Sequence, residues 1–175
     1  MTGPRLAKGA ILKGFVQYIN KQWGDTGVKS CSGYVGIDLK NIIDDKWYPN
    51  VYTDDLLTWI SDRYDRNHIK RAGFEAVAGK KLISVPARIA GIERVAEKGV
   101  NDFKDSIAFG KVSIKSIDEG AQVMFKDVSM IEETCLAWQG AFEGILALTK
   151  TKGEVEKVAC EHWGDRHCIW NIKWK

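Results

Sequence analysis

The sequence predicts an α+β fold in which an antiparallel sheet, made of two hairpins, packs against helices from the N-terminal half. Apolar residues recur at helical spacing in the first half, two later segments alternate around turn residues, and a helical segment separates these hairpins. Consecutive hairpins favour an antiparallel sheet covered by helices. The 175 residues are expected to form a single domain, 1–175, with a mainly helical part at about 8–100 and a β-β-α-β-β part at about 107–174.

The composition is that of an ordinary globular protein, with 45% hydrophobic and 28% charged residues. The net charge of +3 comes from scattered basic residues, so we expect no nucleic-acid partner. The sequence lacks the run of about 18 apolar residues that a membrane span requires, and its N-terminus lacks the apolar core of a signal peptide. We therefore expect a cytoplasmic protein whose four cysteines are thiols or metal ligands rather than disulfides.

The first helix is expected over residues 8–23. Ile11 and Ile19 belong to its apolar stripe, and Gly24 can end it. The small residues of segment 31–36 predict a connection that follows this helix.

A short capped helix and a chain break are expected next. Asp38 can cap a helix that runs through Ile43, and the Trp-Tyr-Pro segment 47–49 interrupts regular structure. Thr53 then predicts the N-cap of a second clear helix, with acidic residues in its first turn.

Two further helices are expected before the pattern changes to strands. One covers residues 67–78, and the other covers residues 85–98, with Pro86 near its start and Gly99 at its end. The expected strands are residues 107–117, 121–125, 155–163 and 168–174.

A long helix over residues 131–149 is expected between the two hairpins. Gly140 and Gly144 lie four residues apart inside it. Each glycine lowers helix propensity by about 1 kcal/mol relative to alanine, so a close backbone contact is a reason to have them there.

Three of the four cysteines, Cys135, Cys160 and Cys168, fall in the β-β-α-β-β part. A regular strand places residues two or four apart on one face, so Glu156 and Cys160 are expected to point the same way. Thiolates and one carboxylate can form a closed tetrahedral zinc site. From the residues alone, half-buried thiols in a small core and redox chemistry are alternatives.

Two motifs in this part resemble those of a known family. Segment 160–174 contains Cys-x3-Gly-Asp-x2-Cys followed by Trp170, and the long helix contains Cys-x4-Gly-x3-Gly from Cys135. Together they resemble the 4-vinyl reductase domain over about residues 107–174. Segment 8–24 is similar to the opening helix of haem–nitric-oxide sensor domains, which belong to the same wider group of ligand-binding folds as vesicle-tethering subunits.

The resemblance implies a structural zinc. Family members that sense aromatic compounds hold zinc with Cys, Glu, Cys and Cys, which correspond here to Cys135, Glu156, Cys160 and Cys168. Four protein ligands leave no open coordination position, so this zinc is expected to be structural and not catalytic.

Haem is not expected. The haem sensors of the wider group use a proximal histidine and a Tyr-x-Ser-x-Arg clamp, and this sequence contains neither the clamp nor a histidine in the corresponding region. Its histidines are His68, expected to be a surface or satisfied polar residue, and His162 and His167, which are alternative metal ligands at the hairpin turn.

The predicted function is non-catalytic binding of an apolar or aromatic small molecule, as a sensor or carrier. No Ser-His-Asp order, nucleotide loop or paired-carboxylate motif is recognisable, so we expect no enzyme, and the pairs 44–45 and 54–55 of aspartates are interpreted as solvated caps. A pocket of this kind is mostly apolar. The candidate lining residues are Trp59, Phe74, Phe109, Phe125, Trp138 and Phe142.

The alternative is a structural, tethering or accessory subunit, for example of a biosynthetic enzyme, that acts through dimerisation. In this hypothesis the face with Gly140 and Gly144 lets two protomers approach, so a homodimer is expected. A sensor without a recognisable ATPase or DNA-binding segment would act on a separate signalling or enzyme partner.

Overall fold

The computed structural model describes residues 3–78, 94–95 and 98–174. Its elements are, in order, β1 (Leu6–Lys8), α1 (Gly9–Val35), η1 (Leu39–Asn41), β2 (Trp47–Pro49), α2 (Val51–Arg63), α3 (Asn67–Ala78), β3 (Lys111–Ile117), β4 (Gly120–Lys126), α5 (Glu132–Leu148), β5 (Gly153–Ala159), η2 (Glu161–Trp163) and β6 (Cys168–Trp174). Residues 98–106 are also helical.

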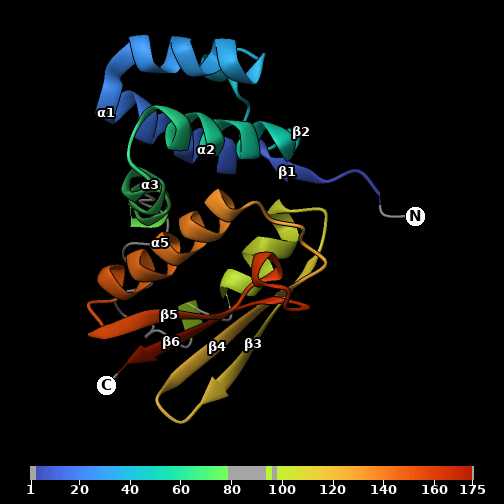
Figure 1. The fold of residues 1–175 in the computed structure, drawn as a ribbon, viewed down its shortest axis with the longest axis vertical. Helices are drawn as coiled ribbons and strands as arrows, with labels where there is room; N and C mark the ends of the chain where they lie inside the picture. The colour runs from blue at the N-terminus through green and yellow to red at the C-terminus, as the bar shows by residue number, and fades with distance from the viewer. Residues whose placement is uncertain (1–2, 79–93, 96–97, 175) are drawn as a thin grey trace.

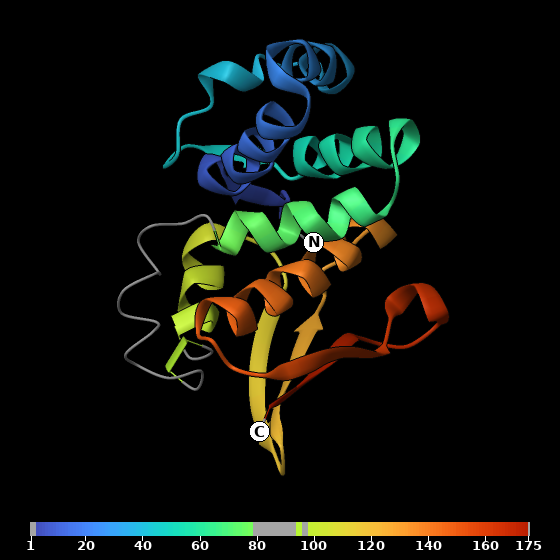
Figure 2. The same cartoon turned by 90° about the vertical axis from the view of Figure 1, so that its left-hand side faces the viewer.

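The elements form three layers. In Figure 1, α1 and α2 lie above, α3 and α5 lie beneath them, and the larger sheet lies below α5. Figure 2 shows from the side that α3 lies between the upper helices and α5. None of the helices that the structure describes combines the length and the apolar character that a membrane crossing demands.

The larger sheet has the strand order β3-β4-β6-β5, and all its neighbours are antiparallel. Cross-strand pairs of buried residues line its inner face, for example Val123 with Trp170 and Phe125 with Cys168. Such pairs are the unit of sheet stabilisation. The predicted α+β class and the two antiparallel hairpins on either side of a helix are therefore confirmed.

Residues Gly9–Val35 form α1, which consists of two helices that meet at Gly24, so the first helix ends there as predicted. Gly24 has φ 63° and ψ −166°, a non-helical conformation open to glycine, and it forms the kink between the two helices. Beyond the bend, Val28 and Cys31 are buried in the core of the upper layer. Segment 31–36, predicted as a connection, is instead helical through Val35, where Cys31 and Val35 are buried.

The chain around residue 50 also differs from the prediction. Segment 47–49 is the strand β2, which pairs with β1 in a small antiparallel sheet. The helix α2 begins at Val51, two residues before the expected cap Thr53. Asp38 does cap a short helix, η1, because its side chain accepts a hydrogen bond from the Lys40 N–H at 3.0 Å.

The next expected helix, over residues 67–78, matches α3. The predicted helix over residues 85–98 lies almost entirely outside the described residues. Gly99 lies within the helical residues 98–106, so it does not end a helix as predicted.

Glycines let α3 and α5 approach each other closely. A Cβ atom on Gly140 would lie 1.8 Å from the carbonyl oxygen of Lys70, and one on Gly73 would lie 1.9 Å from that of Ala137. A Cβ on Gly144 would lie 2.8 Å from the carbonyl oxygen of Phe74. The glycine face of α5 is thus covered by α3 of the same chain. The expected use of this face between protomers was wrong, since no room is left there for a second copy.

We expect Gly140→Ala to lower the free energy of unfolding by about 1–3 kcal/mol or more, because the added methyl group overlaps backbone that cannot move separately. Urea unfolding measures this change. Gly33→Ala is the matched control, since Gly33 lies in α1 with open space around its Cα. There the substitution should be neutral or stabilise the helix by up to about 1 kcal/mol. Equal effects at the two positions would contradict the close helix contact.

Candidate functional site

A cavity of about 150 Å³ lies where α1, α2, α3 and α5 meet segment 103–109. Fifteen of its nineteen lining residues are apolar or glycine. An engineered cavity of about 150 Å³ lined by apolar side chains stays dry and binds benzene or xenon. Its size and lining therefore suit a small apolar molecule of about one aromatic ring.

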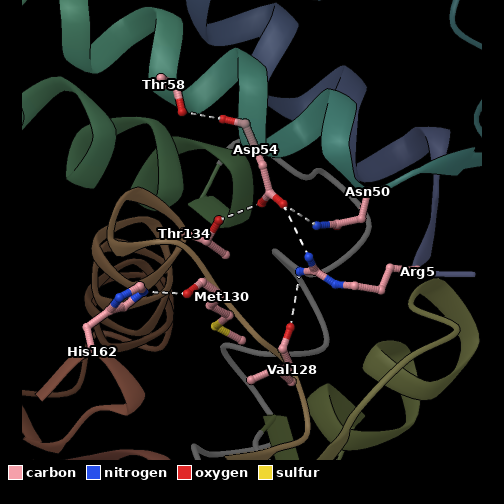
Figure 3. A network of polar contacts seen from close by, with 8 residues as sticks. All are labelled: Arg5, Asn50, Asp54, Thr58, Val128, Met130, Thr134 and His162. Carbon is pink, nitrogen blue, oxygen red and sulfur yellow. Dashed lines mark hydrogen bonds and ion pairs between the residues drawn. The ribbon is translucent and has the colours of Figure 1, made fainter. Parts of the chain in front are cut away.

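Three of the four polar residues of the lining gather around one buried carboxylate (Figure 3). Arg5, Asn50 and Thr134 line the cavity, and each points at Asp54, which is only 8% exposed. Asn50 Nδ2 donates to Asp54 Oδ2 at 3.1 Å, and Thr134 Oγ1 donates to Asp54 Oδ1 at 3.0 Å. Arg5 Nη1 lies 3.7 Å from Asp54 Oδ2. The interpretation of Asp54 as a solvated cap was therefore wrong.

Burial raises the pKa of Asp54, and the Thr134 hydroxyl, the Arg5 charge and the Asn50 amide partly offset this rise. Arg5 also donates from Nη2 to the carbonyl oxygen of Val128 at 3.1 Å. Its guanidinium carbon lies 4.7 Å from the centre of the Phe109 ring. The network thus joins the N-terminal segment, α2, α5 and the segment before α5.

A second cavity, of about 80 Å³, adjoins the first and is lined by apolar and aromatic residues of the inner sheet face, α5 and helical residues 98–106. Phe103 and Trp138 line both cavities. Trp138 also packs on Phe125, with ring centres 4.8 Å apart. The two aromatic side chains of Phe103 and Trp138 therefore form the partition between the cavities.

The predicted pocket residues fall into two groups. Trp138 lines both cavities, Phe109 lines the first, and Phe125 and Phe142 line the second. Trp59 and Phe74 are absent from both linings as described, and Trp59 packs in the upper core, where its ring centre lies 5.8 Å from that of Trp23.

The polar end of the cavity was not predicted from the sequence. Arg5, Asn50 and Thr134 come from distant segments, so no local spacing connects them. One signal in the sequence could have indicated part of this network. Asn50 lies directly before α2, and asparagine favours helix N-caps.

The structure brings three of the four predicted metal ligands together. The Sγ atoms of Cys135, Cys160 and Cys168 all lie within 4.8 Å of one another, and those of Cys135 and Cys168 are 3.9 Å apart. All three residues are buried. Glu156 is not part of this group, because its carboxylate is exposed and pairs with Lys173 Nζ at 3.2 Å.

A β-bulge explains this arrangement. The register between β5 and β6 shifts between Lys157 and Ala159, which interrupts the regular alternation of the strand. Cys160 is consequently buried while Glu156 and Val158 are exposed. The prediction that Glu156 and Cys160 share a face assumed an unbroken strand.

The cluster contains its own cation. Lys157 Nζ lies 2.7 Å from Cys160 Sγ, and 5.2 and 5.1 Å from the ring centres of Trp163 and Trp170. Burial disfavours the Cys160 thiolate, but the hydrogen bond and the charge of Lys157, together with a backbone N–H, lower the pKa of Cys160 below its usual value. Burial raises the pKa of Cys135 to about 12. The group thus places an ammonium beside the thiol whose pKa is lowered, next to a thiol whose pKa is raised.

The histidines lie outside both cavities. His68 Nδ1 is 2.7 Å from the Tyr18 hydroxyl, which makes it the satisfied polar residue that was expected. His162, in η2, bonds through Nε2 to the carbonyl oxygen of Met130, as Figure 3 shows. No histidine is found in the described lining of either cavity.

No protein-family model matches the sequence, and no curated protein matches it either. Solved structures do match, and the following are all H-NOX domains. An oxygen-binding H-NOX domain related to soluble guanylate cyclases, in its oxygen complex, has a TM-score of 0.72 and 15% identity, with 96% of this chain and 95% of that chain covered. An H-NOX protein from S. oneidensis in the Fe(II)NO state has a TM-score of 0.72 and 15% identity, with 96% and 99% covered. A structure described as probing heme distortion in the H-NOX family has a TM-score of 0.70 and 17% identity, with 96% and 95% covered. The chain therefore shares this fold over nearly its whole length.

These matches correct two expectations. The resemblance to the 4-vinyl reductase domain is contradicted, because the strong structural matches are H-NOX domains and no family model supports the resemblance. The zinc set carried over from that family loses its basis, and Lys157 supplies positive charge within the thiol cluster. The expected absence of haem is also contradicted, since the fold is that of heme-containing domains.

The described cavity residues do not, however, match a haem site. Haem iron in proteins is held by His, Cys, Met or Tyr, and Met130 is the single residue of these types in the described linings. The larger cavity, about 150 Å³, has the size that accepts one benzene ring, whereas haem is a macrocycle of four pyrrole rings.

We expect Thr134→Val to lower the free energy of unfolding by about 1–3 kcal/mol, because a buried carboxylate oxygen loses its donor. Thr134→Ser keeps the hydroxyl and should lose much less. Urea unfolding of both variants measures the difference, and equal losses would show that the lost methyl contacts matter more than the hydrogen bond.

Asp54 should also shape the pH dependence of stability. Its folded pKa is raised above the unfolded value, so its favourable contribution is full below the unfolded pKa and is lost as pH rises through the folded pKa. Asp54→Asn removes this titration. Unfolding curves across the acidic range should show a decline with rising pH that the wild type has and the variant lacks. Parallel curves would contradict the raised pKa.

Proposed function

We propose that this chain is a small-molecule sensor domain, without turnover of its own, that holds a small apolar or aromatic molecule in the larger cavity. The observation that carries this proposal is a cavity of about 150 Å³ with fifteen apolar or glycine residues and one polar end. Ligand pockets commonly combine an apolar lining with few polar groups that fix orientation. The similar H-NOX structures are described with bound oxygen and in an NO state. By analogy, we propose that this chain also binds a small molecule as a sensor.

The polar end gives a bound molecule a route to the rest of the fold. Arg5 and Thr134 both line the cavity and both contact Asp54, so a ligand that displaces either side chain changes the network around a buried charge. That network spans the N-terminal segment, α2 and α5. We propose that a change in it passes the signal to a separate signalling or enzyme partner.

Benzene is expected to stabilise the protein saturably. At a hundred times its dissociation constant a ligand adds about 2.7 kcal/mol, which corresponds to a rise in Tm of about 5–10 °C for a domain of this size. A thermal-shift titration measures this rise, and xenon binding by NMR gives an independent readout. A three-ring aromatic compound, which exceeds the cavity, should have no effect.

Ala141→Leu tests the location. Ala141 lines the larger cavity, and three additional carbon atoms there should fill it and remove the shift caused by benzene. Ala147→Leu is the matched control, because Ala147 is exposed on the same helix. A shift that persists unchanged in Ala141→Leu, or its absence in the wild type, would overturn the proposal.

A further inference from the structure

Lys157 and Cys160 form an unusually close pair. The 2.7 Å between Nζ and Sγ is a separation that one oxygen atom bonded to both atoms would span. Among the described residues, no carboxylate forms an ion pair with Lys157, so its nitrogen has no acidic partner that would draw it away from sulfur.

The fold holds the pair in place. The bulge in β5 buries Cys160 although Glu156, four residues earlier, is exposed. The Lys157 ammonium lies near the Trp163 and Trp170 rings, and aromatic rings attract a cation in this position. Trp170 is fully buried and Trp163 is 64% exposed, so the pair lies directly beneath the surface. Lys157 itself is half-buried, so a small oxidant reaches the pair from its side.

We propose that Lys157 and Cys160 are a modification site at which dioxygen forms a covalent N–O–S bridge between their side chains. One oxygen atom joins Nζ to Sγ, and the other leaves as water with two of the three ammonium hydrogens. Nitrogen and sulfur each give up two electrons, and these four electrons reduce the dioxygen. The ammonium–thiolate pair becomes a neutral cross-link, and Cys135 and Cys168 stay as thiols.

The other thiols define the competing outcomes. Cys168 and Cys135 lie within 4.8 Å of Cys160, so a disulfide is the alternative product of oxidation. A thiol oxidised alone gives sulfenic acid as its first product. The three products differ in mass: the bridge gains one oxygen and loses two hydrogens, a disulfide loses two hydrogens, and sulfenic acid gains one oxygen.

Intact-mass spectrometry of the full chain, exposed to air and then alkylated, tests the proposal. The expected result is a mass gain of one oxygen less two hydrogens, which disappears after treatment with a reductant. Tryptic mapping should find segment 153–166 as one uncleaved peptide with the same gain, because trypsin cannot cut after a modified Lys157. Anaerobic protein should lack the gain. A disulfide, a sulfenic acid or an unchanged mass would overturn the proposal.

Variants locate the two bonded atoms. Lys157→Met and Cys160→Ser should abolish the mass gain, and Lys157→Arg should abolish it while it keeps the positive charge. Cys31→Ala is the control, since Cys31 is buried in the other core cluster and should leave the gain intact. The mapping on the wild type decides the question even if a cluster variant fails to fold. A gain that persists in Lys157→Arg would also overturn the proposal.

Discussion

The backbone contact between α3 and α5 positions the helix that contributes to both cavities and to the thiol cluster. Gly73 and Gly140 remove the two side-chain atoms that would keep the helices apart, so the carbonyl groups of one helix lie against the Cα atoms of the other. Since α5 contributes Thr134, Cys135 and Trp138, this contact fixes one wall of the larger cavity, the partition to the smaller one and one member of the thiol cluster. The positions of Thr134, Cys135 and Trp138 thus depend on the two glycines that let the helices approach.

Burial of charge is handled differently at the two polar centres. Asp54 keeps a carboxylate in the interior with two neutral donors and a guanidinium at 3.7 Å, and desolvation still dominates its pKa. At Cys160 desolvation is again the largest single cause, but an ammonium at 2.7 Å, a backbone N–H and the Cys168 thiol together outweigh it, so the pKa is lowered. A shorter distance to the opposite charge and additional hydrogen bonds to the charged form both act against desolvation.

Local patterns predicted the sheet, α3 and α5, because each depends on spacing within one segment or one hairpin, and they placed Cys160 and Cys168 at the two sides of one turn. The polar network escaped prediction, since Arg5, Asp54 and Thr134 meet only after the layers pack. A register shift in β5, which an alternating pattern does not reveal, separated Glu156 from the thiols.

The motifs behind the family resemblance partly reflect backbone geometry. Gly140 allows a close helix contact, and Gly164 has a φ of 93° in the turn. Unrelated sequences that share such geometry share such glycines.

Thr134 and Cys135 are neighbours in the first turn of α5, yet one belongs to the cavity and the other to the thiol cluster. His162, two residues after Cys160, bonds to the carbonyl oxygen of Met130 on the cavity wall. If oxidation of the thiol cluster moves the first turn of α5, the affinity for the cavity ligand changes. Binding free energies are reciprocal, so ligand binding must then shift the oxidation equilibrium by the same factor. The chain would then respond jointly to two signals, the oxidation state of the thiol cluster and the occupancy of the cavity.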